Sequence, residues 1–468
     1  MSLEKDSVMD MIKLSYEKGT IAVRGGGRLP NTSWDSGAKC YRALALHYRD
    51  ITDYLRGSGV PFEDTVLDPP PCPRFGKPKA KLRDYQTKAL LAWKKAGKWG
   101  TIVLPTGAGK TFVAVEAIYQ INEPCLVVVP TIDLLEQWAE RLRKELEVKV
   151  GIFGGGKHEV EALTIATYDS AHLRAEQLGN KYLFLIFDEV HHLPAPSYSA
   201  VAELFVSPYR MGLTATYERE DGLHTNLPHL VGGKVYEVSV QELAGEHLAE
   251  YDLKIIKTEL TPEEKEEYDR YSKIFRRYIN KRGILIRTPA DFRRFVMLSG
   301  RDPKAREALL ARHKARVIAF NSEAKLKALR ELLKRHSRDR VLIFTEHNKL
   351  VQRISRLFLI PAITHRTKKE ERRYNLARFK EGLYRVIVTS KVLDEGIDVP
   401  EANVGIILSG TGSTREYRQR LGRLLRKKDG KRALLYEIVS RNTSEVMTSK
   451  RRHISVKKKL ADNRKGVR

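Results

Sequence analysis

The sequence predicts an α/β protein in which two doubly wound parallel-sheet domains follow one another along the chain. Three observations lead to this prediction. Short apolar runs alternate with amphipathic stretches from about residue 80, these runs are apolar at nearly every position, and the pattern begins again near residue 340. Runs of this kind are typical of parallel strands that are covered by helices on both faces of their sheet.

The first of these domains is assigned to residues 81–240. Its strands are predicted at residues 101–105, 125–130, 163–168 and 182–189, with helices at Lys110–Ile121 and Leu134–Leu146. The second domain is assigned to residues 241–445. Its strands are predicted at residues 340–347, 359–365, 384–390, 403–410 and 432–439. Strands that alternate with helices in this way form βαβ units, which place neighbouring strands parallel.

A helical insert is predicted within the second domain, at about residues 261–316. Thr261 is a suitable N-cap, because Pro262 follows it and acidic residues occupy the first turn. The first helix carries aromatic residues at helical spacing, namely Tyr268, Tyr271, Phe275 and Tyr278. These side chains either form the core of the insert or stack on unpaired bases. We favour the core, because an isolated helical insert needs apolar contacts to hold it.

Three further segments complete the predicted organisation. Residues 1–66 are expected to form a small α+β domain, with a hairpin around Lys18-Gly19 and a helix at about residues 41–55. Residues 67–80 are rich in proline and are predicted to form a linker. Residues 446–468 carry nine Lys/Arg and one Asp, so they are expected to form a basic arm.

The chain is strongly basic, with a formal net charge of +27. Residues 270–316 hold 15 Lys/Arg and 3 Asp/Glu, so the insert carries much of this excess. Such a charge distribution favours nucleic acid as a partner, with an anionic membrane surface as the second candidate. No stretch approaches the ~20 apolar residues that span a bilayer. Three widely separated cysteines argue against a disulfide scaffold, and we expect a cytoplasmic protein.

The segment LPTGAGKT at residues 104–111 lies between a predicted strand and a predicted helix. This is the setting of a phosphate-binding loop, in which glycines let backbone N–H groups face phosphate oxygens. Lys110 is expected to bind the β- and γ-phosphates, and the Thr111 hydroxyl to bind Mg²⁺. The candidate nucleotide-binding residues are Thr106, Gly107, Ala108, Gly109, Lys110 and Thr111. ATP and Mg²⁺ are therefore the expected ligands, with no other small-molecule substrate.

The segment DEVHH at residues 188–192 ends an apolar strand, which is where ligands bind in α/β sheets. Asp188 is expected to hold Mg²⁺, and Glu189 to orient the water that attacks the γ-phosphate. His191 and His192 have no further cluster of histidine or cysteine beside them. We therefore expect a hydrogen-bonded link to residues 214–216 rather than a zinc site.

Two arginines of the second domain complete the predicted hydrolytic site. Arg423 and Arg426, in QRLGRLLR, lie three residues apart on one face of a predicted helix. Arginines in this role stabilise the charge of the phosphoryl group as it is transferred. The alternative is a solvated basic helix.

In this order, the motifs resemble those of superfamily 2 helicases, whose two lobes are RecA-like domains. LRDYQ is similar to the adenine-reading Q motif, with Gln86 as the reader. VPTIDLLEQW at residues 129–138 is similar to motif Ia, and IATYDS at residues 165–170 to the DNA-contacting segment that follows it. The resemblance implies that Gly396 and Asp398, in motif V, contact the nucleotide from the second lobe. It also implies that Arg423 and Arg426 act as arginine fingers.

Within this superfamily, the sequence resembles the XPB family in its shorter, archaeal form. DEVHHLPA, the triplet Arg219-Glu220-Asp221 and the basic insert carry this resemblance. It implies that residues 1–66 are a damage-recognition domain and that the insert is a thumb. The implied activity is that of a DNA-stimulated ATPase and 3′–5′ helicase or translocase, which opens duplex DNA in nucleotide excision repair or transcription. The implied partners are double-stranded and forked DNA and a nuclease, in an archaeal cell where the protein is associated with the nucleoid.

Candidate DNA-contacting residues lie in the triplet and in the insert. By charge alone, Arg219, Glu220 and Asp221 form either a salt-bridged loop or a wedge at a duplex junction, and their position in the family favours the wedge. In the insert, the candidates are Arg276, Arg277, Lys281, Arg282, Arg293 and Arg294. Rival functions are an architectural protein with a nucleotide switch, a translocating subunit of a restriction enzyme or nuclease, and an RNA helicase. Glu189 and the arginine pair argue against the first of these rivals, since switching alone needs no hydrolytic residues.

Overall fold

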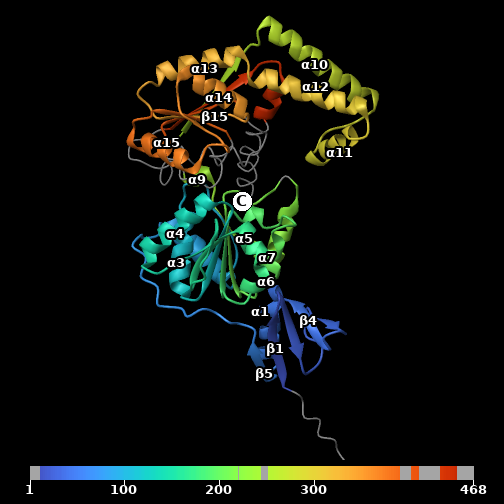
Figure 1. The fold of residues 1–468 in the computed structure, drawn as a ribbon, viewed down its shortest axis with the longest axis vertical. Helices are drawn as coiled ribbons and strands as arrows, with labels where there is room; N and C mark the ends of the chain where they lie inside the picture. Colours follow the sequence, from blue (N-terminus) through green and yellow to red (C-terminus); the bar gives the residue numbers. More distant parts are fainter. Residues whose placement is uncertain (1–10, 220, 244–250, 391–401, 410–432, 451–468) are drawn as a thin grey trace, which may run out of the picture. The chain divides into compact units, whose positions relative to one another are not determined.

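The computed structural model describes residues 11–219, 221–243, 251–390, 402–409 and 433–450. The chain divides into two compact units (Figure 1). The first comprises residues 1–104 and 109–239, and the second comprises residues 105–108 and 240–468. Each unit contains a large, mainly parallel sheet with helices against it. The predicted α/β fold class, with two such domains in tandem, is therefore confirmed.

The large sheet of the first unit has eight strands in the order β13-β6-β12-β11-β7-β10-β8-β9. They are β6 (Trp99–Val103), β7 (Cys125–Val129), β8 (Gly151–Gly154), β9 (Lys157–His158), β10 (Leu163–Thr167), β11 (Phe184–Asp188), β12 (Tyr209–Thr214) and β13 (Lys234–Glu237). All neighbouring pairs are parallel except β8 with β9. The four predicted strands correspond to β6, β7, β10 and β11, and the other four strands were not predicted.

Helices pack against both faces of this sheet. They are α2 (Asp84–Lys95), α3 (Lys110–Ile121), α4 (Ile132–Leu146), α5 (Tyr168–Leu173), α6 (Ala175–Leu178), α7 (Ser199–Glu203) and α8 (Leu227–Leu230). Figure 1 shows α3 and α4 on one side of the strands and α5, α6 and α7 on the other. The predicted helix Lys110–Ile121 matches α3, whereas α4 begins two residues before its predicted start. The reason is that the side chain of Thr131 accepts a hydrogen bond from the Leu134 N–H and caps the helix there.

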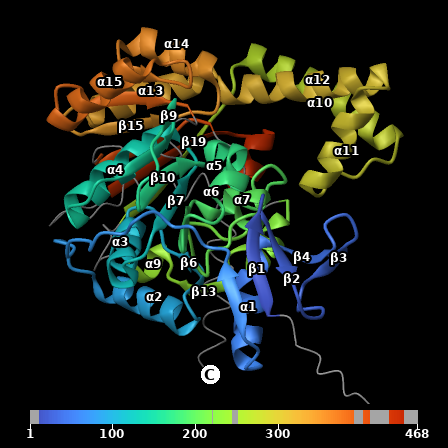
Figure 2. The ribbon, with the colours of Figure 1, turned by 60° about the horizontal axis from the view of Figure 1, so that its bottom comes forward.

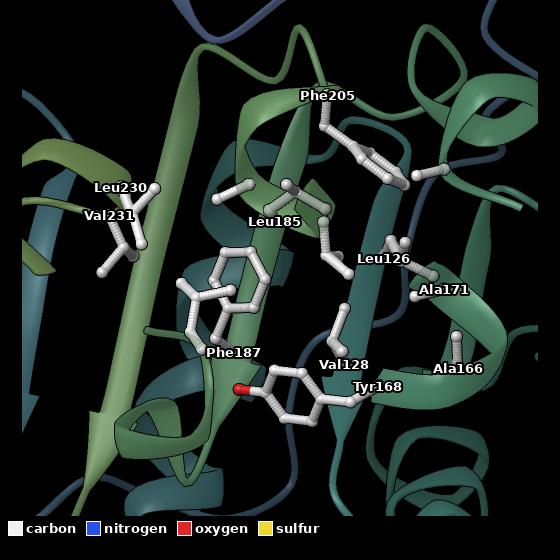
Figure 3. Close-up of a cluster of buried hydrophobic side chains, with 14 of the residues drawn as sticks. Leu126, Val128, Ala166, Tyr168, Ala171, Leu185, Phe187, Phe205, Leu230 and Val231 are labelled. Atoms are coloured by element: carbon white, nitrogen blue, oxygen red, sulfur yellow. The ribbon is translucent and has the colours of Figure 1, made fainter. Parts of the chain in front are cut away.

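One core cluster lies between the strands and α5–α7 (Figure 3). Alternate side chains of two neighbouring strands, Leu126 and Val128 of β7 and Leu185 and Phe187 of β11, belong to it. The opposite face of the same strands is also buried, as the near-continuous apolar runs in the sequence indicate.

The small N-terminal domain contains a five-stranded sheet in the order β3-β4-β2-β1-β5. Its strands are β1 (Ile12–Glu17), β2 (Thr20–Arg24), β3 (Ser33–Asp35), β4 (Cys40–Leu44) and β5 (Phe62–Thr65). The hairpin predicted around Lys18-Gly19 is confirmed, and both residues have positive φ. The helix predicted at residues 41–55 is wrong in its first part, because β4 pairs with β2 on one side and β3 on the other. A 3-10 turn (Ala45–His47) follows, and helix α1 begins only at Tyr48 and ends at Gly57.

The small domain contacts the large sheet domain of the same unit at the amino ends of its strands. The Arg49 side chain of α1 donates a hydrogen bond to the carbonyl of Gly97, just before β6, at 2.8 Å. The Tyr16 hydroxyl donates to the Leu204 carbonyl at 3.1 Å. Val206 is buried within the apolar core of the small domain. These contacts lie at the edge of the sheet opposite to the glycine-rich loop of residues 104–111, which follows the carboxyl end of β6.

The second unit contains a parallel sheet of six strands in the order β14-β19-β18-β15-β17-β16. They are β14 (Tyr251–Thr258), β15 (Val341–Phe344), β16 (Ala362–Ile363), β17 (Val386–Thr389), β18 (Val404–Ile407) and β19 (Ala433–Ser440). The helices outside the insert are α9 (Val240–Leu243), α13 (Glu323–Arg335), α14 (Asn348–Phe358) and α15 (Lys369–Glu381). All five predicted strands are present, and β14 was not predicted.

Three helices form the insert: α10 (Pro262–Lys281), α11 (Pro289–Ser299) and α12 (Pro303–Phe320). In Figures 1 and 2, α10 and α12 run side by side and α11 lies at one end of the pair. The predicted cap is confirmed, because the Thr261 hydroxyl accepts from the Glu264 N–H and the Glu264 carboxylate accepts from the Thr261 N–H. Tyr268 is buried against α12, and Phe275 and Tyr278 pack around Phe295. The aromatic stripe is therefore the core of the insert.

Candidate functional site

The loop between β6 and α3 turns sharply at its two glycines. Gly107 and Gly109 have φ of +85° and +73°, a region that side-chain-bearing residues rarely adopt. A Cβ added at Gly109 would lie 2.5 Å from Nε2 of Gln86. Helix α3 begins directly after this turn, at Lys110, so its amino end lies beside the loop. The amino end of a helix next to a glycine-rich turn is suited to an anion.

Gln86 of α2 joins its own motif to this loop. Its side chain is buried; Nε2 donates to the carbonyl of Gly109 at 3.3 Å, and Oε1 accepts from the Arg83 N–H at 2.8 Å. The segment LRDYQ and the glycine-rich loop are thus in direct contact. Both segments were predicted to bind the nucleotide, and a shared site requires them to lie close together.

The two acidic residues of the DEVHH segment lie at the same edge of the sheet as the loop. Strands β6 and β11 both pair with β12, and this pairing brings the carboxyl ends of the two outer strands level with each other. Lys110 Nζ lies 3.6 Å from Glu189 Oε1, and both side chains are largely buried. Glu189 has φ of +48°, an unusual backbone conformation for a residue with a side chain. Strained residues of this kind concentrate at functional sites.

The Asp188 carboxyl group is buried at the end of β11. Burial raises its pKa to about 6, and the nearby charge of Glu189 acts in the same direction, whereas the Lys110 ammonium and the Trp138 N–H lower it. Asp188 Oδ1 accepts from the Glu189 N–H at 3.0 Å, and Oδ2 accepts from Nε1 of Trp138 at 2.8 Å. The Tyr168 hydroxyl donates to the Asp188 main-chain carbonyl at 3.2 Å. Trp138 and Tyr168 were not among the predicted site residues, although both lie in segments that resemble helicase motifs.

His191 links this site to the end of β12. Its Nδ1 lies 3.0 Å from the Thr214 hydroxyl and 3.5 Å from Glu189 Oε2. The Thr214 hydroxyl in turn donates to the Thr216 carbonyl at 2.8 Å. The predicted hydrogen-bonded link is therefore confirmed. Among the residues that the structure describes, no group of three or more metal-ligating side chains is present.

The Arg219 triplet forms a salt-bridged turn after β12. The Arg219 guanidinium binds both carboxylate oxygens of Asp221, at 2.9 and 2.6 Å, and also donates to the His191 carbonyl. The Arg219 hydrogen bonds lower the pKa of Asp221 to about 2. Of the two interpretations left open by the sequence, the salt-bridged loop is present, and the wedge stays a prediction. Glu220 lies outside the described residues.

The basic candidates of the insert are all exposed on α10, α11 or the turn after α10. Arg282 lies 3.5 Å from Asp302, and Arg294 lies 3.9 Å from Asp291. Arg276 and Arg277 extend from consecutive positions of α10, and Arg277 borders a surface hollow with Arg270 and Lys273. The structure does not describe the four residues of the second domain that were predicted to contact the nucleotide. They are Gly396, Asp398, Arg423 and Arg426.

A glycine-rich loop beside an acidic strand end in one α/β domain, followed by a second α/β domain, is the arrangement of two-domain helicases. Three family models match in this order: "Xeroderma pigmentosum group B helicase damage recognition domain" at residues 14–66, "Type III restriction enzyme, res subunit" at 79–219, and "Helicase conserved C-terminal domain" at 324–428. The helicase domain of Hef from Pyrococcus furiosus is similar in fold, with a TM-score of 0.51 at 19% identity over 79% of this chain and 97% of that one.

Curated relatives identify the family. The chain is 48% identical to the DNA 3'-5' translocase XPB2 of Sulfurisphaera tokodaii, over 94% of this chain and 100% of that protein. It is 30% identical to the DNA 3'-5' helicase XPB of Mycobacterium tuberculosis, over 78% of this chain and 61% of that protein. It is 29% identical to the XPB/SSL2 subunit of general transcription and DNA repair factor IIH of Saccharomyces cerevisiae, over 80% of this chain and 43% of that protein. The chain belongs to the XPB family.

The chain thus matches the whole length of the Sulfurisphaera tokodaii protein and a smaller share of the Mycobacterium tuberculosis and Saccharomyces cerevisiae proteins. Within the parts of the chain that the structure describes, no helix is long and apolar enough to cross a membrane.

Proposed function

We propose that this chain is an ATP-dependent DNA helicase or translocase that moves with 3′–5′ polarity and opens duplex DNA in nucleotide excision repair or transcription. One observation carries the proposal. Lys110, at the start of α3, and Glu189, directly after β11, lie 3.6 Å apart beside a turn whose two glycines have positive φ. This pairing of a cation and a carboxylate supports a site of ATP hydrolysis, and the chain belongs to a family whose curated members are named as DNA 3'-5' helicases and translocases.

The triphosphate is proposed to bind at the loop of residues 106–111. The backbone N–H groups of Gly107, Ala108 and Gly109 are proposed to bind its oxygens, since successive N–H groups in a glycine-rich turn can form an anion site. The Ala108 N–H donates to the Pro105 carbonyl at 3.1 Å and would exchange this contact for the triphosphate. The Lys110 ammonium replaces its contact with Glu189 by contacts with the β- and γ-phosphates. Thr106 lines the loop, and Gln86, already bonded to it, reads the adenine.

Oxygen donors beside the loop fit Mg²⁺, which prefers hydroxyl, carboxylate and water ligands. We propose that the Thr111 hydroxyl and the Asp188 carboxylate hold this ion, directly or through water. When bound, Mg²⁺ supplies positive charge against the phosphate oxygens. Glu189 Oε2 is buried and accepts no hydrogen bond from the residues that the structure describes, so we propose that it accepts a proton from an attacking water. His191 Nδ1 lies 3.5 Å from this oxygen.

The second lobe is proposed to complete the site when nucleotide is bound. Arg423 and Arg426 stabilise the charge that develops during phosphoryl transfer, and Gly396 and Asp398 contact the nucleotide. Replacement of either arginine by lysine should then lower turnover while leaving nucleotide affinity nearly unchanged, because the guanidinium acts mainly in the transition state.

Double-stranded and forked DNA are the proposed nucleic-acid partners. The exposed cations of α10, α11 and the turn between them contact the phosphate backbone, and the triplet after β12 acts at the duplex junction. The exposed residues concerned in the insert are Arg276, Arg277, Lys281, Arg282, Arg293 and Arg294. We further infer a nuclease partner and a cytoplasmic, nucleoid-associated location. Affinity capture of the whole chain with an assay for nuclease activity tests the partner.

Phosphate release tests the proposed function. Forked DNA should raise the ATP turnover of the whole chain, and RNA of the same sequence should raise it less. Glu189→Gln should bind ATP and release phosphate roughly 10²–10³ times more slowly, in line with the loss of one catalytic polar group. Glu176→Gln, an exposed carboxylate of α6, is the control and should behave as the wild type. Equal stimulation by RNA would indicate an RNA helicase instead of a DNA helicase. Normal turnover in Glu189→Gln would refute the catalytic role proposed for Glu189.

A further inference from the structure

Two aromatic side chains outside the candidate nucleotide residues hold Asp188 in place. Nε1 of Trp138 donates to Asp188 Oδ2 at 2.8 Å, and the Tyr168 hydroxyl donates to the Asp188 carbonyl at 3.2 Å. All three residues are almost wholly buried. The Glu189 N–H donates to Asp188 Oδ1. Both carboxylate oxygens and the main-chain carbonyl of Asp188 therefore accept a hydrogen bond.

The two donors come from different elements. Trp138 lies in the second turn of α4, which follows β7, and Tyr168 is the first residue of α5, which follows β10. Strand β7 pairs with both β10 and β11, so these helices begin at the same edge of the sheet at which β11 ends. Thr131 caps α4 and Thr167 caps α5 at that edge. Helices α4 and α5 are therefore each hydrogen-bonded to Asp188, the acidic residue that ends β11.

We propose that Trp138 and Tyr168 are positioning residues. Trp138 fixes the direction of the Asp188 carboxylate, Tyr168 holds the main-chain carbonyl of Asp188, and together they couple this residue to the positions of α4 and α5. The inference rests on the proposed function, in which Asp188 holds Mg²⁺ beside the triphosphate. It assigns the two aromatic residues a part in that reaction that their place in the apolar core does not require.

The chemistry of the donors supports this role. A carboxylate has about four lone-pair sites, of which the indole N–H and the Glu189 N–H occupy two. The other lone pairs stay available for a metal-bound water or for the metal. An indole N–H is neutral, so it orients the carboxylate without cancelling its charge, whereas a lysine or arginine in the same place would compete with Mg²⁺.

The geometry also implies coupling. A ligand that displaces the amino end of α4 or α5 also displaces a hydrogen-bond donor to Asp188, because each helix and its aromatic residue move together. DNA bound at this edge of the sheet would thereby alter the alignment of Asp188, which is a direct route from DNA binding to hydrolysis. In the opposite direction, occupation of the nucleotide site would restrain both helices.

The alternative is that both rings serve only to fill the core. Tyr168 does belong to the core cluster with Phe187, as Figure 3 shows. Trp138→Phe and Tyr168→Phe keep most of the apolar contact and remove the donors. The chain offers matched controls: Trp93 is buried in the same domain and donates to the Arg210 carbonyl at 2.8 Å, and the Tyr16 hydroxyl donates to main-chain carbonyls at the opposite edge.

The experiment compares Trp138→Phe and Tyr168→Phe with Trp93→Phe and Tyr16→Phe in the whole chain. The first readout is the Mg²⁺ concentration that gives half-maximal binding of a fluorescent ATP analogue, and the second is the ratio of ATP turnover with and without forked DNA. Trp138→Phe should raise the Mg²⁺ requirement about tenfold, as loss of an outer hydrogen bond to a metal ligand does, and should lower the stimulation ratio. Tyr168→Phe should change both in the same direction by less. Neither control should change them.

Each outcome decides the inference. The inference is overturned if Trp138→Phe and Tyr168→Phe match their controls in both readouts. A residue that only fills the core would leave the Mg²⁺ requirement and the stimulation ratio unchanged. If Trp138→Phe does not fold, Tyr168→Phe alone decides. If the wild type binds Mg²⁺ and nucleotide but does not hydrolyse ATP, the proposed function fails, while the Mg²⁺ requirement still decides whether the aromatic residues position Asp188.

Discussion

A buried ion pair in the second unit predicts a large local loss of stability when one partner is removed. Lys325 Nζ, on α13, lies 2.5 Å from Glu445 Oε1 and 2.7 Å from the Leu408 carbonyl. The two side chains are 1% and 2% exposed. Glu445 Oε2 also accepts from the Ser440 N–H at 2.9 Å. The pair thus joins α13, the end of β18 and the segment that follows β19.

Lys325→Met should lower the local stability by about 3 kcal/mol. Removal of the lysine takes a cation away from a buried carboxylate, and the loss of one partner of a buried ion pair typically costs ~3–5 kcal/mol. The Ser440 N–H remains bonded to the carboxylate, so the lower end of that range applies. Lys325→Met combined with Glu445→Gln removes the charge as well, and most of the lost stability, roughly 2 kcal/mol, should return.

Native-state hydrogen exchange at the amides of β18 and β19 measures this effect, because it reports the free energy of local opening. Lys334→Met is the control, since Lys334 and Glu331 form an exposed pair at 3.3 Å whose loss should change little. A loss below about 1 kcal/mol in Lys325→Met, or a double variant that is no more stable than the single one, would refute the reasoning.

Three other perturbations have defined outcomes. Tyr16→Phe removes the hydroxyl contact between the small domain and the sheet domain, so limited proteolysis within the linker of residues 67–80 should become faster; an unchanged rate would show that docking does not depend on this contact. Asp188→Asn should raise the melting temperature of the protein at pH 8 in EDTA, because burial raises the carboxyl pKa from 3.8 to about 6 and ionisation in the folded state then costs up to about 3 kcal/mol above pH 6. This gain should shrink as the pH falls from 6 and vanish below about pH 4, and a gain that is constant with pH would contradict the assignment. Arg276→Glu combined with Arg277→Glu should weaken duplex binding and lower the slope of log affinity against log salt by about 2, measured by equilibrium titration at several salt concentrations, whereas an unchanged slope would place the DNA elsewhere.

The parts of the fold that local chemistry controls could be predicted from the sequence. Strand β7 is apolar at every position, and β11 at every position before Asp188, because both faces of the sheet are covered. Helix α3 begins at Lys110 because the glycine turn ends there. Thr261 and Glu264 cap each other within four residues of chain, so their contact was visible in the sequence.

Features that depend on distant partners were not predictable in this way. Cys40–Leu44 is a strand because β2 and β3 pair with its two edges. The sequence of this segment by itself did not favour a strand over a helix. Trp138 and Tyr168 looked like ordinary core residues, since their contacts with Asp188 join segments 50 and 20 residues away. The Arg219–Asp221 pair is local, yet charge alone did not decide between a closed loop and a wedge.

ATP turnover of Lys110→Ala in the presence of forked DNA tests the central claim most directly. The account predicts that turnover falls roughly 10²–10³-fold or more, because the cation beside the glycine turn is lost at the transferring phosphates. Lys94→Ala, an exposed lysine of α2, should match the wild type. Turnover in Lys110→Ala equal to that in Lys94→Ala would contradict the assignment of this loop as the hydrolytic site.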